Sequence, residues 1–208
     1  MGRYLGPKCR LCRSSGMKLF LKGDRCYSSS CPIERKGAVP PGQHGPKRKT
    51  TTSDYGRQLK EKQKLKRLYQ VSEEQFRRYF EKSLKAKGKE TGLLLLQTLE
   101  RRLDNVVYRL GFAPSRSVAR QLVSHGHILV NNKKVDIPSY EVKVGDVISL
   151  RPQALKIEIV KKALEEKERK IPEWLKRKAT VGKIERLPSR EEIESEIDES
   201  LIVEFYSR

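Results

Sequence analysis

Positive charge falls steadily along this chain from the N-terminus to the C-terminus. Residues 1–70 contain 18 basic and 4 acidic residues, residues 71–140 contain 13 and 7, and residues 141–208 contain 15 of each. The net charge is +20 over 208 residues, and so large an excess repels itself unless an anionic partner offsets it. We predict that the N-terminal two thirds bind a nucleic acid, and an anionic membrane surface is the alternative partner. The neutral C-terminal third is predicted to pack or to contact protein.

The apolar content argues against a protein that spans a membrane. Hydrophobic residues make up 36% of the chain, and the mean hydropathy is −0.70. No run approaches the ~20 apolar residues that cross a bilayer, and the N-terminus lacks the apolar stretch of a secretory signal. We expect a cytoplasmic protein with one large or two small domains.

All four cysteines lie within the first 31 residues, as Cys9 and Cys12, then Cys26 and Cys31. Two and four residues separate the members of each pair, spacings that let thiolates turn back onto one tetrahedral ion. The segment is too short to build a hydrophobic core of its own, so it needs a metal ion or a cross-link to stabilise it. The pattern predicts one structural zinc ion held by these four residues. An iron–sulfur cluster is the runner-up, and disulfides or free thiols are further alternatives.

Basic residues continue through a loop and into a helix. Residues 36–53 are rich in proline and glycine and are predicted to be irregular, either ordering against RNA or acting as an inert linker. Residues 54–69 are predicted to be helical, with Asp54 at the first turn. At ~100° per residue, four basic side chains of this helix share about a quarter of its circumference. This basic stripe consists of Arg57, Lys60, Lys64 and Arg67. A solvated charged face is the alternative interpretation.

A second helix is predicted to begin at Ser72, with Gln75 completing a capping box, and to stop near Gly88. Its apolar face, Phe76, Phe80 and Leu84, is predicted to be core.

Residues 93–150 form a module of mixed secondary structure. One helix is predicted up to Gly111 from apolar residues at helical spacing, and a shorter helix starts at Ser115 and carries Arg116 and Arg120. A strand pair follows, turning at Asn131 and Asn132 and presenting Lys133 and Lys134. Helices and a hairpin that present cations suit the shape and phosphates of RNA. His125 and His127 are predicted to have structural or RNA-contacting roles, because no nucleophile or paired carboxylate accompanies them.

Two stretches of this module, residues 99–112 and 119–140, resemble the bacterial S-four family of small-subunit ribosomal proteins. The similarity extends to Arg3 and Tyr4, to the loop of residues 40–45, and to the ending at 203–208. The four cysteines resemble the zinc-bearing subset of that family. Asn132 departs from the pattern, which often has glycine there, but asparagine tolerates the same backbone angles.

The resemblance implies a structural protein of the small ribosomal subunit, not an enzyme. It implies primary binding of ribosomal RNA that nucleates assembly of the subunit body, an influence on translational accuracy, and neighbouring proteins five and twelve. Alternatives are an RNA-modifying enzyme, for which residues 151–208 are too short to add a catalytic domain, and a zinc-ribbon transcription factor.

In the C-terminal third, residues 156–168 are predicted to be helical, and Trp174 is predicted to anchor the fold. Ser189 and Glu192 form a second capping box that opens a short acidic helix. Residues 201–205 are predicted to form a terminal strand or a docked segment.

The expected fold class is α+β, with a zinc-stapled arm, a helical domain, and an RNA-binding module of helices packed on a short antiparallel sheet. The expected segments are 1–46 (arm and basic loop), 47–92 completed by 183–208 (helical domain), and 93–182 (RNA-binding module with extension). The residues predicted to contact RNA are Arg3, Lys8, Arg10, Arg13, Lys22, Lys47, Arg48, Lys49, Arg57, Lys60, Lys64, Arg67, Arg116, Arg120, Lys133 and Lys134.

Overall fold

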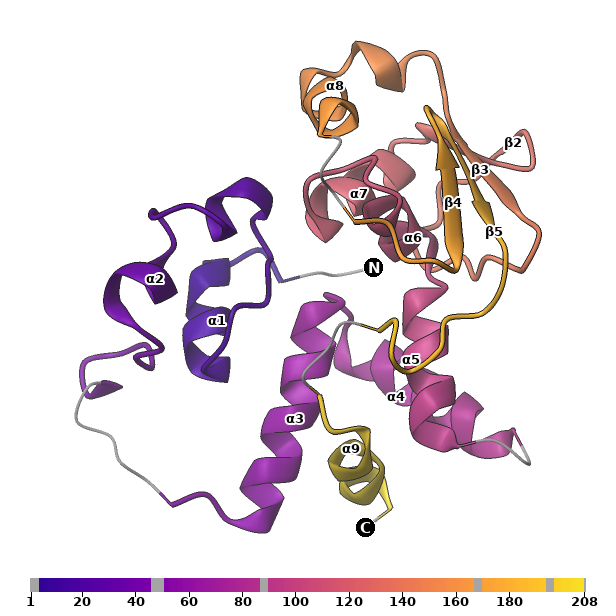
Figure 1. Cartoon of the computed structure of the whole chain (residues 1–208). Coiled ribbons are helices and arrows are strands. Elements are labelled where there is room, and N and C mark those ends of the chain that lie inside the picture. Colours follow the sequence, from indigo (N-terminus) through magenta and orange to yellow (C-terminus); the bar gives the residue numbers. More distant parts are fainter. Residues whose placement is uncertain (1–3, 46–50, 87–89, 167–169, 194–196, 208) are drawn as a thin grey trace. The chain divides into compact units, whose positions relative to one another are not determined.

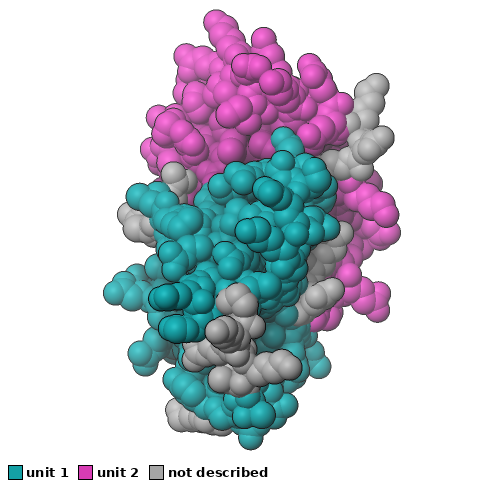
Figure 2. Space-filling model, turned by 90° about the vertical axis from the view of Figure 1, so that its left-hand side faces the viewer, with its two compact units in different colours: residues 1–94, 195–208 teal, residues 95–194 magenta. Residues whose placement is uncertain are grey.

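The chain folds into two compact units, shown in different colours in Figure 2. Unit 1 comprises residues 1–94 and 195–208, and unit 2 comprises residues 95–194. The structure is a computed structural model that describes residues 4–45, 51–86, 90–166, 170–193 and 197–207. No helix in these ranges is long and apolar enough to cross a membrane. The predicted division into three segments stays a prediction.

The N-terminal part of unit 1 is a short helical arm (Figure 1). Its elements are α1 (Lys8–Ser15), η1 (Gly23–Cys26) and α2 (Pro32–Lys36). Leu19 and Leu21 are buried beside Cys12, and Leu68 of the next helix packs against them. The arm therefore has a small apolar core in addition to its cysteines, although its sequence looked too short to supply one.

The rest of unit 1 consists of three helices, α3 (Asp54–Leu68), α4 (Glu73–Lys85) and α9 (Glu199–Tyr206). Asp54 lies in the first turn of α3 as predicted, with the side chain of Ser53 as the cap, and the side chain of Ser72 caps α4 as predicted. α4 ends at Lys85, and the predicted stop at Gly88 lies outside the described residues.

The apolar face of α4 is partly as predicted. Phe76 and Phe80 are buried, whereas Leu84 is 51% exposed, so the core assignment of Leu84 is wrong. The Tyr206 ring of α9 stacks on Phe80, with ring centroids 4.6 Å apart. The C-terminal segment is therefore a docked helix and not a strand.

Unit 2 packs helices on one face of a five-stranded antiparallel sheet of order β2-β1-β3-β5-β4 (Figure 1). The strands are β1 (Ile128–Val130), β2 (Lys133–Lys134), β3 (Val147–Leu150), β4 (Leu175–Lys178) and β5 (Val181–Ile184). Asn131 and Asn132 have φ of 50° and 63°, the left-handed turn that the sequence predicted. Trp174 is 1% exposed within the core, as predicted.

The helices of this half of the chain differ from the prediction in three places. The helices themselves are α5 (Thr91–Glu100), α6 (Leu103–Arg109), α7 (Arg116–Ser124), η3 (Ala154–Lys156) and α8 (Glu158–Glu165). The single helix predicted up to Gly111 is broken at Arg102, which is extended and bridges to Glu141. The helix predicted over 156–168 is α8, which is shorter at both described ends. Glu192 accepts the backbone N–H of Ser189 as a capping box would, but residues 190–193 form a turn and not the predicted acidic helix.

Candidate nucleic-acid interface and cysteine pocket

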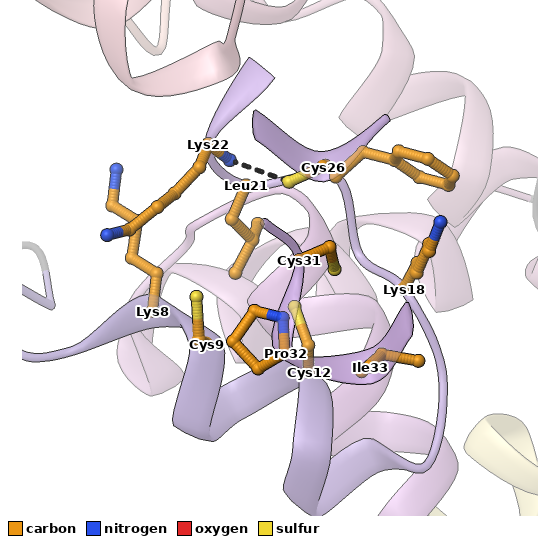
Figure 3. Close-up of a pocket in the computed structure, with 11 residues that line it drawn as sticks. Lys8, Cys9, Cys12, Lys18, Leu21, Lys22, Cys26, Cys31, Pro32 and Ile33 are labelled. Atoms are coloured by element: carbon orange, nitrogen blue, oxygen red, sulfur yellow. Dashed lines mark hydrogen bonds between the residues drawn. The ribbon is translucent and has the colours of Figure 1, made fainter. Parts of the chain in front are cut away.

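The four cysteines line one pocket in the arm. Cys9 and Cys12 lie on α1, Cys26 ends η1, and Cys31 precedes α2. Gly16 and Gly23 have φ of 74° and 63° and let the chain turn back between the pairs. Figure 3 shows the sulfur atoms of Cys9 and Cys12 directed from α1 toward the facing loop that carries the other pair.

The cysteines of this pocket form no disulfide, and three of the four are buried. All four are free cysteines, and burial raises the pKa of Cys12 and of Cys26, with the neighbouring cysteines adding to both shifts. The backbone N–H of Lys22 donates to Sγ of Cys26 at 3.4 Å (Figure 3). The donor chemistry matches zinc, which is commonly bound by four thiolates. Among the described side chains, however, no three His, Cys, Asp or Glu are arranged to hold a metal ion.

The basic residues predicted in the arm occupy different environments. Arg10 and Lys22 are exposed, and Lys8 is half-buried on the rim of the cysteine pocket. Arg13 instead donates to the carbonyl oxygens of Val39 and Pro40, which ties α1 to the proline-rich loop. Arg3, Lys47, Arg48 and Lys49 lie outside the described residues.

The predicted basic stripe on α3 is not uniform. Lys60 is exposed, and Arg57 is exposed but paired with Asp54. Lys64 lies 3.4 Å from the Glu61 carboxylate. Arg67 donates to the hydroxyls of two serines on α1, Ser14 at 2.8 Å and Ser15 at 3.3 Å. Through these two hydrogen bonds Arg67 joins α3 to α1. Burial lowers the pKa of Arg67.

A carboxylate network beside the stripe was not predicted from the sequence. Glu73 of α4 accepts hydrogen bonds from Lys62 at 2.6 Å, Lys66 at 2.8 Å and the Tyr206 hydroxyl at 3.0 Å. Burial alone would raise the pKa of Glu73, but the two lysines outweigh burial and lower it to about 2. The Lys62 ammonium also lies 4.6 Å from the centroid of the Phe205 ring. A sequence signal existed, because Lys62 and Lys66 are four residues apart on one helix face.

Arg116 and Arg120 are buried inside unit 2. Arg116 is 8% exposed, donates to Oδ1 of Asn105 at 2.8 Å and stacks on Tyr108. Arg120 is 6% exposed and lies 3.8 Å from the Asp104 carboxylate. Both side chains hold α7 to α6, an arrangement that does not favour the predicted RNA contact.

Lys133 and Lys134 are exposed on β2, at the edge of the sheet. Like the exposed residues of the arm and of α3, they present charge to solvent. The described residues thus offer several separate cationic surfaces, each suited to phosphate.

Comparison with known proteins gives matches over the whole chain. Residues 3–100 match the family described as Ribosomal protein S4/S9 N-terminal domain, and residues 101–148 match the S4 domain. A protein named small ribosomal subunit protein uS4 from a Thermoanaerobacter species is 59% identical over 210 residues, with all of both chains covered. A protein of the same name from Thermus thermophilus is 54% identical over 211 residues, again with all of both chains covered.

Proposed function

The chain belongs to the uS4 family of small ribosomal subunit proteins, and from this premise we propose that it binds ribosomal RNA early and nucleates assembly of the subunit body. This is a family of ribosomal structural proteins and not of enzymes, so the chain acts by binding. Its place is the ribosome, in the cytoplasm. The observation that carries the proposal is the identity of 59% with all of both chains covered. An influence on translational accuracy is part of the proposal.

The proposed mechanism is neutralisation of phosphates together with recognition of RNA shape. The exposed cations Arg10, Lys22, Lys60, Lys133 and Lys134 support it. Arg3, Lys47, Arg48 and Lys49 remain part of the proposed interface. Arg116 and Arg120 are proposed instead to set the shape of the module that meets RNA, because they are buried.

Neighbouring ribosomal proteins are the other partners. Proteins five and twelve are the proposed neighbours, on the family resemblance.

We also propose that Cys9, Cys12, Cys26 and Cys31 bind one structural zinc ion. Their shared pocket and the absence of a disulfide among them support this proposal, as do Lys8 and Lys22 on the pocket wall, which would offset the charge of the thiolates. The sulfur atoms would have to draw together to ligate one ion. Zinc bound by four thiolates has no open position for water, so the ion would supply folding energy and not catalysis.

Chemical footprinting of small-subunit ribosomal RNA with the full chain tests the proposed function. We expect protection at a helical junction, with affinity falling as salt rises. An RNA that shows no protection at any junction would defeat the proposal.

A further inference from the structure

The C-terminal third of the chain is neutral overall, but its charge is sorted. Residues 175–184, the β4–β5 hairpin, contain four basic and no acidic residues. The remainder of 141–208 contains 11 basic and 15 acidic residues. The β4–β5 hairpin is therefore strongly basic, although the net charge of residues 141–208 is zero.

Packing fixes the inner face of this hairpin. Leu175 and Ile184 are 3% and 1% exposed within the core of unit 2. Gly182 faces Leu110 so closely that a Cβ at this position would overlap the leucine side chain. Arg177 also points inward, donating to the carbonyl oxygens of Leu110 and Leu164. Because strand residues alternate between faces, these contacts determine which side chains point outward.

The outward side chains form a cationic surface across the sheet. The register pairs Lys178 with Val181, Val181 with Ser149, Ser149 with Leu129, and Leu129 with Lys134, so all five side chains lie on one face. At ~4.8 Å between strands, lysines stand at the two ends of a row about 19 Å long. Lys183 lies on the same face, two residues further along β5, where it pairs with Lys176 and Val147. We call these six residues, Leu129, Lys134, Ser149, Lys178, Val181 and Lys183, the outer sheet face.

This face keeps its positive charge and is open. The helices α6 and α7 pack on the opposite side of the sheet (Figure 1). Lys134, Lys178 and Lys183 are exposed, and within the described residues none of them has an acidic group at ion-pair distance. Lys176, their neighbour on β4, is by contrast paired with Glu185 at 2.6 Å.

We propose that the outer sheet face binds a strand of ribosomal RNA through its phosphates. The lysines at the two ends supply the charge, and the small or uncharged residues between them let a backbone lie close to the sheet. None of the six residues is aromatic, so the face lacks the base-stacking platform of sheet proteins that read single strands. Recognition should therefore be independent of base sequence. The inference rests on the proposed function and adds to it a second surface, on unit 2.

The test compares two double variants of the full chain. Lys178→Gln with Lys183→Gln removes two charges from the outer sheet face. Lys156→Gln with Lys161→Gln removes two exposed charges from η3 and α8 in the same unit and serves as the matched control. Binding to a small-subunit ribosomal RNA fragment is measured over a range of salt concentrations. We expect the first variant to lower the slope of log affinity against log salt by about 2, since each lost phosphate contact lowers it by about 1. The control should match the original chain.

Replacing Lys178 and Lys183 by arginine should restore the original slope, because arginine keeps the charge. If the glutamine variant and the control give the same slope, the outer sheet face is not an RNA surface, and the inference fails while the proposed function stands. Normal RNA binding combined with loss of an acidic protein neighbour would also overturn it. If the original chain does not bind the RNA, the proposed function itself fails.

Discussion

Among single residues, Glu73 links three helices of unit 1. Its carboxylate receives Lys62 and Lys66 from α3 and Tyr206 from α9. Burial, reinforced by the charge of Glu73, raises the pKa of Tyr206, so the phenol stays protonated and continues to donate. Lys62 is only 5% exposed, and its charge is balanced by this one carboxylate and by the aromatic rings of α9.

Replacing Glu73 by glutamine should therefore loosen the docking of α9. We expect unit 1 to lose about 1–3 kcal/mol of stability at neutral pH, because a buried ammonium loses its ionic partner. Hydrogen exchange of the amides in α3 and α9 measures the effect. Glu81→Gln on the same helix is the control: its pair with Arg77 is exposed, and it should change little. Equal exchange in the two variants would contradict this role of Glu73.

The same carboxylate predicts a pH effect. The pKa of Glu73 is about 2 in the folded chain and 4.5 in its ordinary state, so its contribution to stability is complete above about pH 4.5. That contribution is lost as the pH falls from about 4.5 to about 2, because the unfolded chain binds the proton more readily. The stability difference between the original chain and Glu73→Gln should shrink over this interval. Denaturant unfolding at pH 7 and pH 3 tests it, and a constant difference would refute it.

At the scale of elements, the α3 stripe combines the proposed RNA contact with internal support. Lys60→Gln should lower the salt slope of RNA binding by about 1 and leave the fold intact, because this side chain is exposed. Arg67→Gln should in addition speed hydrogen exchange in α1, because the hydrogen bonds to Ser14 and Ser15 are lost. If Lys60→Gln leaves the slope unchanged, the stripe does not belong to the interface.

The hairpin gives a second prediction about an element. Gly182→Ala should destabilise unit 2 by about 1–3 kcal/mol, because the added methyl group overlaps Leu110 in a packed core. Fluorescence of Trp174, the only tryptophan and a buried residue of this unit, reports unfolding. Val181→Ala, on the exposed face of the same strand, is the control and should be nearly neutral. Similar unfolding midpoints for the two variants would contradict the close packing of β5 on α6.

Structural features that depend on neighbouring residues were predicted correctly from the sequence, and features that depend on distant residues were not. The Ser72 cap and the Asn131 turn depend on neighbouring residues alone, and both were predicted. The break at Arg102 is set by distant backbone groups: Leu103 donates its N–H to the Tyr140 carbonyl, while the apolar spacing runs on without interruption. The β4–β5 hairpin was missed because Gly182 and Arg177 occupy inward positions, which hides the usual alternation.

The residues of the candidate site show the same difference between local and long-range features. The type and spacing of the cysteines predicted one shared metal site. The four residues do line one pocket, but among the described side chains no three potential ligands are arranged to hold a metal ion, so the zinc site stays a prediction. The burial of Arg116 and Arg120 was not readable, because it depends on Asn105 and Asp104 presented by another helix. A basic residue at helical spacing looks the same in a sequence whether it faces phosphate or a buried carboxylate.

For the molecule as a whole, the two units have different kinds of core. Unit 2 is built on a large apolar cluster that includes Trp174, whereas the arm of unit 1 has only a few buried apolar residues beside its cysteines. A metal ion would therefore matter greatly to the arm and little to unit 2. The same division separates the proposed RNA surfaces, with α3 and the arm in unit 1 and the outer sheet face in unit 2.

Removing metal should accordingly loosen one part of the chain only. We expect about one zinc per chain, and we expect a chelator to speed hydrogen exchange over residues 8–36 while the Trp174 unfolding transition of unit 2 stays where it was. Cys12→Ser should reproduce the effect without chelator, and Lys36→Gln at the exposed end of α2 is the control. RNA affinity should fall in the chelated chain, because the cations of α1 would no longer be held in place. A chain that contains no metal, or iron with sulfide, refutes the zinc proposal, and a chelator that shifts the Trp174 transition refutes the independence of unit 2 from the arm.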